Sequence, residues 1–160
     1  MSAASRAARA AHVGLVAATL LVVASQGACK GKDGSPDAVV RTTWRAAIEG
    51  NGAAFRATYP TEAELRALFE PAMAKTLLDQ IELGAKSVPK KPPAVEISDI
   101  VVEKEADVPA GAGLLRPARL ARVKLQIKLP RVEPEAETMT LVKLGELWRA
   151  LPKAAASLLP

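Results

Sequence analysis

The chain has 160 residues and few of the groups that most enzymes use for acid–base chemistry. Its single histidine is His12, so residues 29–160 contain no histidine. That absence excludes a His-containing catalytic triad, a His general base and a His-ligated metal from this part of the chain. The sequence also lacks a Gly-x-Ser-x-Gly elbow, a phosphate-binding loop and a dinucleotide fingerprint. The sequence therefore favours a non-catalytic protein, and it predicts no catalytic residue, cofactor or metal site.

Acidic residues are absent from the first 28 positions, where Arg6 and Arg9 make the start basic. Residues 13–24 then form an apolar run, and small and polar residues follow it. A basic start, a short apolar stretch and a small-residue exit are typical of a secretory signal peptide. A transmembrane helix needs about 20 apolar residues, which is more than this run provides. We therefore expect residues 1–28 to be a signal peptide and the protein to be exported.

The only cysteine of the chain follows this segment, and an unpaired cysteine in an exported protein requires an explanation. Gly27, Ala28 and Cys29 resemble the lipobox of bacterial lipoproteins, whereas Gln26 stands where that family usually has an apolar residue. The resemblance implies that the Cys29 thiol is acylated, that cleavage occurs before it, and that lipid holds the protein on a membrane of the bacterial cell envelope. The alternative is cleavage after Ala24, which would leave a soluble exported protein.

Three further segments follow the signal peptide. Residues 29–36 contain glycine, lysine, aspartate, serine and proline, a composition typical of a flexible tether. Residues 37–152 are long enough to bury the core of one domain. Residues 153–160 are expected to be a frayed C-terminal tail.

Helical patterns occupy the first half of the domain. Ser35-Pro36 predicts a helix start, and Gly50-Asn51-Gly52 predicts the end of that helix. Thr61 and Glu64 have the spacing of a capping box and predict another helix. A further helix is expected from about Pro71, with Gly84 as its stop.

Strand patterns follow a basic, proline-rich linker at 86–93. The clearest strand is 118–129, because apolar and polar residues alternate along it. Other strands are expected at 95–102, 137–144 and 147–151, with a loop at 106–117 and a bulge at Ser98-Asp99. Helices followed by antiparallel strands predict an α+β fold. We expect a single domain, in which N-terminal helices pack on a curved antiparallel sheet and Trp44 packs against Trp148.

Residues 38–60 and 142–152 together resemble the opening and closing segments of nuclear-transport-factor-two-like domains. The first contains the helix break Gly50-Asn51-Gly52, and the second has Gly145 in a turn before Trp148 on the last strand. The resemblance implies a cone-shaped α+β fold with an apolar pocket, an arrangement that many small bacterial lipoproteins share. Some members of the family are isomerases or cyclases that use a carboxylate base and a tyrosine donor. The fold alone does not transfer that activity.

Tyr59 and Asp99 are the candidate polar residues of such a pocket. Asp99 is a candidate because it interrupts an apolar strand, although a solvent-facing bulge residue is the simpler interpretation. Tyr59 precedes Pro60 at a helix end, where packing is the simpler role.

A second candidate site is a basic strand face that carries Arg122, Lys124 and Lys128. Such a face could bind anionic lipid headgroups or an envelope polyanion. The alternative is a solvated face whose charges pair with Glu133, Glu135 and Glu137 on the next strand. Nucleic acid is not an expected partner, because the protein is exported and no aromatic residues alternate with these charges.

These observations predict a cell-envelope lipoprotein that acts as a binding or accessory module. Its expected partners are the membrane, through the lipid on Cys29, and an envelope protein or a small apolar ligand. Two alternatives remain open, namely a small-molecule isomerase or cyclase of the same fold and a purely structural envelope protein.

Overall fold

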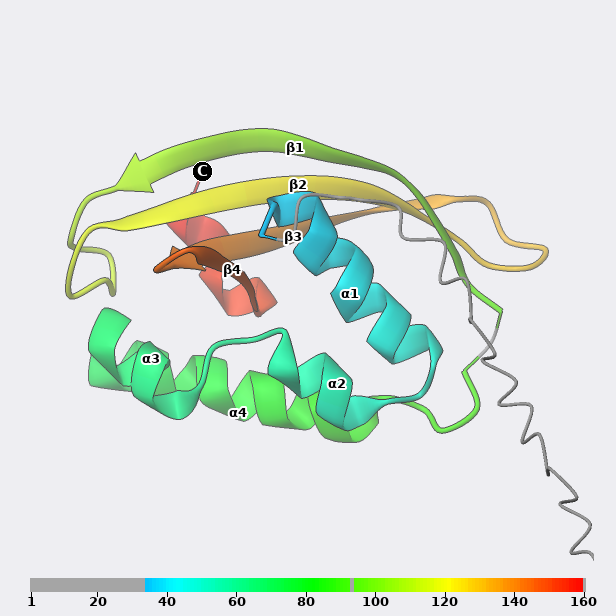
Figure 1. Cartoon of the computed structure of the whole chain (residues 1–160), viewed down its shortest axis with the longest axis horizontal. Coiled ribbons are helices and arrows are strands. Elements are labelled where there is room, and N and C mark those ends of the chain that lie inside the picture. The colour runs from blue at the N-terminus through cyan, green and yellow to red at the C-terminus, as the bar shows by residue number, and fades with distance from the viewer. Residues whose placement is uncertain (1–33, 93, 160) are drawn as a thin grey trace, which may run out of the picture.

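A computed structural model describes residues 34–92 and 94–159, which form four helices, a four-stranded antiparallel sheet and a final 3₁₀ helix (Figure 1). This is the α+β, single-domain fold that the sequence predicted. The elements are α1 (Pro36–Ile48), α2 (Gly52–Ala57), α3 (Glu62–Leu68), α4 (Pro71–Ser87), β1 (Glu96–Val108), β2 (Ala118–Lys128), β3 (Glu135–Leu144), β4 (Leu147–Leu151) and η1 (Lys153–Leu158).

Capping side chains begin two of the short helices. The predicted capping box is present at α3, where the Thr61 N–H donates to the Glu64 carboxylate at 2.7 Å and the Thr61 hydroxyl accepts from the Glu64 N–H. Asn51 caps α2 by accepting from the Ala54 N–H at 2.9 Å. Ser35 stands at the N-cap of α1 without a capping hydrogen bond from its side chain, so Pro36 is the residue that favours this start.

Helix α4 continues through Gly84 to Ser87, so the prediction that Gly84 ends the helix is wrong. A Cβ at Gly84 would lie 3.4 Å from Cε1 of Phe55, so this glycine lets α4 pack closely against α2. A Cβ at Gly52 would lie only 2.5 Å from the carbonyl oxygen of Ala85. The two glycines therefore let the two helices approach each other, and this approach positions Phe55.

Strand β1 extends further than its sequence pattern predicted. The predicted bulge is confirmed, because the register with β2 shifts between Ser98 and Val101, and Asp99 has a φ of 50°. The predicted loop at 106–117 is partly wrong, because β1 continues to Val108. Arg119 of β2 stabilises this extension by donating to the Glu105 carboxylate at 2.6 Å.

The first face of the sheet packs against α1. Residues directly paired on neighbouring strands share a face, and Ala121, Leu141 and Ala150 are paired in this way across β2, β3 and β4. These residues belong to a buried cluster that also contains Trp148, and Trp44 of α1 packs against that cluster, whereas the direct contact predicted between Trp44 and Trp148 stays a prediction. Figure 1 shows α1 in front of the curved strands.

The opposite face of the sheet packs against α3, α4 and η1 over part of its area. Leu120 of β2 is paired with Val142 of β3, and both belong to a second buried cluster with Leu77 of α4 and Leu158 of η1. Figure 1 shows η1 behind the strands. The core therefore lies on both faces of the sheet, and not only between the sheet and α1.

The C-terminal segment is part of this second cluster, so the prediction that residues 153–160 fray is wrong for residues 153–159. Ala155, Leu158 and Leu159 are all buried. The short apolar segment KAAASLL lacks the length of a regular helix, and only its packing on the sheet and α4 orders it.

Candidate functional site

A cavity of about 380 Å³ lies between α1, α2, β3 and the chain that follows β4. We call it the aromatic pocket, because Trp44, Phe55 and Tyr59 line it. The chain has only five aromatic residues, so most of them are gathered at this one cavity. Ala47, Met139 and Leu151 complete its apolar wall.

The pocket exists because β4 is shorter than β3. The last residue of β4, Leu151, pairs with Thr140, and the chain then turns into η1. Within the described residues, the outer edge of β3 from Glu135 to Met139 therefore has no strand paired with it. The pocket forms beside this edge, and side chains from both faces of the sheet contribute to it.

Tyr59 is packed inside the domain. Its ring centroid lies 5.1 Å from that of Phe55, and the two rings are tilted by 45°. Burial raises the pKa of the Tyr59 phenol to about 12, because the charged form loses its hydration. The phenol therefore keeps its proton at any physiological pH and is a hydrogen-bond donor on the pocket wall.

We expect the absorbance change of tyrosinate formation to have its midpoint near pH 12 in the folded protein. Tyr59 is the only tyrosine, so the titration reports one group. The folded state favours the protonated phenol, so the free energy of unfolding should fall as the pH rises from 10 towards 12 and should not change through this group below pH 10. The same titration in denaturant is the control, with a midpoint near 10. A native midpoint near 10 would show that the phenol is hydrated.

An ion pair lies at the pocket. Lys153 of η1 donates to the Glu137 carboxylate of β3 at 2.9 Å, and this hydrogen bond raises the pKa of Lys153. Only 22% of the Glu137 side chain is exposed, whereas the Lys153 side chain is largely exposed. The ion pair therefore gives one side of an otherwise apolar cavity a polar character.

The indole nitrogen of Trp44 is buried and, among the residues described, has no hydrogen-bond acceptor. A buried donor without an acceptor costs about 1–3 kcal/mol. Sequence patterns did not identify Trp44, Glu137 or Lys153 as pocket residues, because they are far apart in the chain. The scarcity of aromatic residues was the one available signal.

The two predicted pocket residues, Tyr59 and Asp99, are not brought together. Asp99 lies exposed in the β1 bulge, and the Ser98 hydroxyl donates to its carboxylate at 3.1 Å. Asp99 is not among the residues that line the aromatic pocket, and the carboxylate that accompanies Tyr59 there is Glu137.

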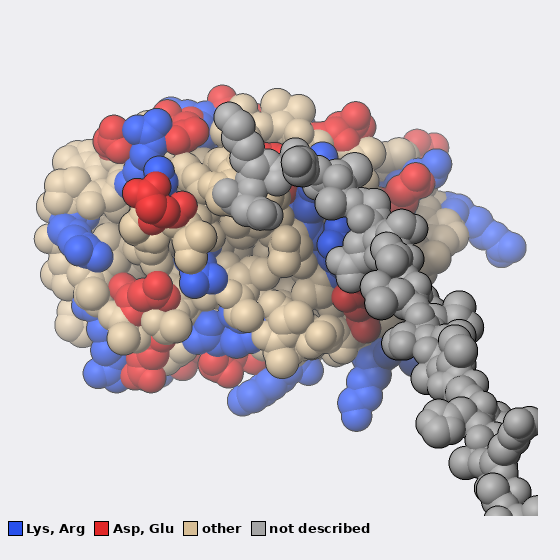
Figure 2. Space-filling model, in the orientation of Figure 1, with Lys and Arg blue, Asp and Glu red and all other residues tan. Residues whose placement is uncertain are grey.

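The basic residues of β2 lie on the sheet face opposite α1. Lys124 pairs with Thr138 and Arg122 pairs with Thr140, whereas Glu137 pairs with Leu125 on the α1 face. The expected pairing of these cations with Glu135 and Glu137 is therefore wrong. In the described part of the chain, no ion pair joins Arg122, Lys124 or Lys128 to a carboxylate. On the face that carries α1, by contrast, acidic and basic side chains are interspersed (Figure 2).

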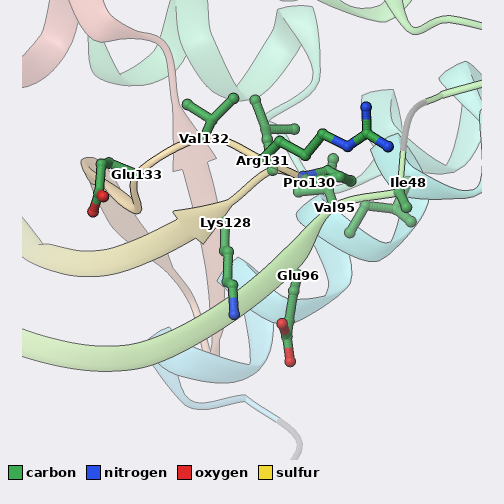
Figure 3. Close-up of a pocket in the computed structure, with 10 residues that line it drawn as sticks. Ile48, Val95, Glu96, Lys128, Pro130, Arg131, Val132 and Glu133 are labelled. Carbon is green, nitrogen blue, oxygen red and sulfur yellow. The ribbon is translucent and has the colours of Figure 1, made fainter.

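A wider cavity of about 660 Å³ lies at the hairpin between β2 and β3 (Figure 3). Ile48, Val95 and Val132 line it together with Lys128 and Glu96. Lys128 and Glu96 are cross-strand neighbours and point to the same side of the strands, whereas Val132 points to the other side. This cavity has no aromatic wall, so it is a weaker candidate for a ligand site than the aromatic pocket.

Cys29, the predicted lipidation site, lies outside the described residues. Between residues 34 and 159, with position 93 left out, no group of three or more His, Cys, Asp or Glu side chains is arranged to hold a metal ion. In the same part of the chain, every helix is too short or too polar to cross a bilayer.

Comparisons with known proteins show a similarity in structure to a solved protein, but no match in sequence. No protein-family model matches the sequence, and no curated protein matches it. A solved Campylobacter jejuni structure, described as that of a candidate NTF2-like transpeptidase, is 11% identical and has a TM-score of 0.45. The match covers 74% of this chain and 99% of that chain. The α+β class of this protein follows from its own helices and strands.

Proposed function

We propose that this protein is a lipid-anchored binding module of the bacterial cell envelope, and that it binds a small, largely apolar ligand in the aromatic pocket. We also propose that its domain is of the nuclear-transport-factor-two-like type. Gly50 and Gly145 support that assignment, because both adopt positive φ at the helix break and at the final turn where the family resemblance lies.

The concentration of aromatic residues at one cavity carries the ligand-binding proposal. Small-molecule sites are concave, mostly apolar and supplied with a few polar groups that orient the ligand. The aromatic pocket has this composition: three aromatic side chains form its wall, and Thr43, Thr140 and the Glu137–Lys153 pair supply polar atoms. Aromatic side chains bury large apolar areas, so a ligand that covers them would gain binding free energy from that burial.

The amino-terminal pattern carries the anchoring part of the proposal. The basic start, the apolar run and the small residues before Cys29 support export, and the position of the only cysteine supports lipid attachment. The described chain begins at Gly34, five residues after Cys29. A fully extended chain of that length spans at most about 18 Å. The lipid would therefore hold the domain close to the membrane surface.

We expect phenylalanine at position 47 to block the pocket. Ala47 lines the cavity from α1, so Ala47→Phe would occupy space that a ligand needs. Fluorescence titration with N-phenyl-1-naphthylamine, a neutral apolar probe, should show about tenfold weaker binding to this variant, equivalent to about 1.4 kcal/mol. Ala156→Phe approaches the same cavity from η1 and should weaken binding in the same direction.

Ala53→Phe is the matched control, because Ala53 is exposed on α2 and does not line the aromatic pocket. This variant should bind the probe as tightly as the unaltered chain. Equal affinity in all three variants, with folding confirmed by circular dichroism, would contradict ligand binding in the aromatic pocket.

A small-molecule isomerase or cyclase is the second candidate function, and one observation favours it. Tyr59 and Glu137 line the same pocket, so a proton donor and a carboxylate are available together. A general base must be free to accept a proton, and here Lys153 donates to the Glu137 carboxylate. We therefore favour ligand binding over catalysis as the function of the aromatic pocket.

A further inference from the structure

We propose that the sheet face opposite α1 docks onto a membrane surface rich in anionic phospholipid. We call it the basic face and define it by Arg122, Lys124 and Lys128 of β2 with their cross-strand neighbours on β1 and β3. Thr138 and Thr140 also line the aromatic pocket, but Arg122, Lys124 and Lys128 do not, and the proposal does not depend on ligand binding there.

Strand register gives the basic face its excess of positive charge. On β1, Lys104 pairs with Arg122, Val101 with Lys124 and Glu96 with Lys128. Among residues with a cross-strand partner, four cations therefore share this face with one carboxylate. Two further carboxylates, Asp99 and Glu103, lie at the register shifts of β1 and have no such partner.

The uncharged residues of the basic face suit contact with a lipid surface. The β3 partners of Arg122 and Lys124 are Thr140, which is buried, and Thr138, which is small and exposed. Val101 lies beside Lys124, and 55% of it is exposed. Small and apolar side chains between cations allow the backbone of the sheet to approach a flat surface closely, and each cation near an anionic surface contributes about 1 kcal/mol.

The spread of the charges favours an extended anionic surface over a small anion. Arg122 and Lys128 are six residues apart on one strand, which corresponds to roughly 20 Å. A single phosphate could reach only one or two of these side chains, whereas a leaflet of anionic headgroups could contact them all. The short connection to Cys29 would keep the domain within reach of such a leaflet if the proposed lipid anchor is present.

Vesicle sedimentation tests this proposal with residues 29–160, the mature chain that the lipobox resemblance implies, carrying Cys29→Ser, so that neither a lipid anchor nor the apolar amino-terminal segment contributes. We expect it to bind vesicles containing one third phosphatidylglycerol more tightly than pure phosphatidylcholine vesicles, and to be released by high salt. Replacing Arg122, Lys124 and Lys128 together by glutamine should weaken phosphatidylglycerol binding by tenfold to about a hundredfold. Lys124→Gln alone, at an exposed position, should weaken it about fivefold.

The matched control replaces Lys86, Lys90 and Lys91 by glutamine, which removes the same charge from exposed positions at the end of α4 and after it. This control should retain most of the phosphatidylglycerol binding. An equal loss of phosphatidylglycerol binding in both triple variants would overturn the proposal, because it would show that net charge alone determines the binding. Absence of a preference for phosphatidylglycerol vesicles would overturn the proposal too, and so would full displacement of the protein from them by soluble glycerol phosphate. Val132 is an exposed apolar residue at the β2–β3 hairpin, outside the basic face. Loss of vesicle binding in Val132→Ser, but not in the basic-face variants, would also overturn the proposal. None of these outcomes affects the ligand-binding proposal, which the naphthylamine probe tests separately.

Discussion

Leu158→Ala is expected to lower the free energy of unfolding by about 2–5 kcal/mol, although Leu158 is the third-last residue of the chain. Its side chain is only 4% exposed and belongs to the cluster that contains Leu77, Leu120 and Val142. Truncation of a buried leucine loses the transfer free energy of the removed atoms and leaves a cavity. Urea unfolding monitored by circular dichroism measures the change, which is a large part of the 5–15 kcal/mol typical of a domain.

Leu147→Ala is the control for this substitution, because the same atoms are removed from a residue that is 53% exposed on β4. We expect a change within about 0.5 kcal/mol. Similar values for the two variants would show that the C-terminal segment does not pack on the sheet in solution. Deleting residues 153–160 should destabilise the domain more than Leu158→Ala does, because Ala155 and Leu159 are buried in the same cluster.

Cys29→Ser is expected to abolish lipid attachment, so that the protein either loses its stable hold on the membrane or remains an uncleaved precursor. The lipobox resemblance places the lipid on the Cys29 thiol, and serine has no thiol to acylate. Two or three acyl chains hold a protein stably on a membrane, whereas a single chain anchors it only marginally. Mass spectrometry of the mature amino terminus should therefore find lipid on Cys29 of the unaltered chain.

Gln26→Leu is the complementary variant, because it restores an apolar residue at the position where the sequence departs from the lipobox pattern. We expect it to raise the fraction of processed, lipid-bearing protein. A free amino terminus at Ser25 in the unaltered chain would show cleavage after Ala24 and would contradict lipid anchoring. That result would leave the ligand-binding proposal intact, because the aromatic pocket lies wholly within the described residues.

Local interactions explain which predictions of the fold were right. The Thr61–Glu64 capping box and the Ser98-Asp99 bulge depend on residues within a few positions of each other, so their patterns are visible in the chain. The strand at 118–129 was recognisable from the alternation of apolar and polar residues along it, which the burial of one side against α1 requires. Two of the incorrect predictions, at Gly84 and at residues 153–159, concern residues whose environment comes from distant elements.

The candidate site was less accessible to sequence reasoning than the fold. Tyr59 was a candidate because some members of the resembled family use a tyrosine donor, and in the structure it lies on the wall of the aromatic pocket. Asp99 was the chosen carboxylate partner, yet Glu137 is the one that lines the pocket, because β4 ends opposite Thr140 and leaves the edge of β3 beside Tyr59. Tyr59 and Glu137 are far apart in the chain, and no sequence pattern indicates that they line the same pocket.

The sequence by itself determined the absence of histidine after residue 29, the α+β order of elements, and the positions of Cys29 and of the cations on β2. These are properties of composition and of short-range periodicity, which do not require a partner element. Only the tertiary structure decided which residues form the aromatic pocket and which charges face one another. The physical reason is strand register, since a shift by one residue transfers every side chain to the opposite face of the sheet. Register placed Glu137 beside the pocket with Lys153 and left Arg122, Lys124 and Lys128 on the other face, without the acidic partners that their proximity in sequence suggested.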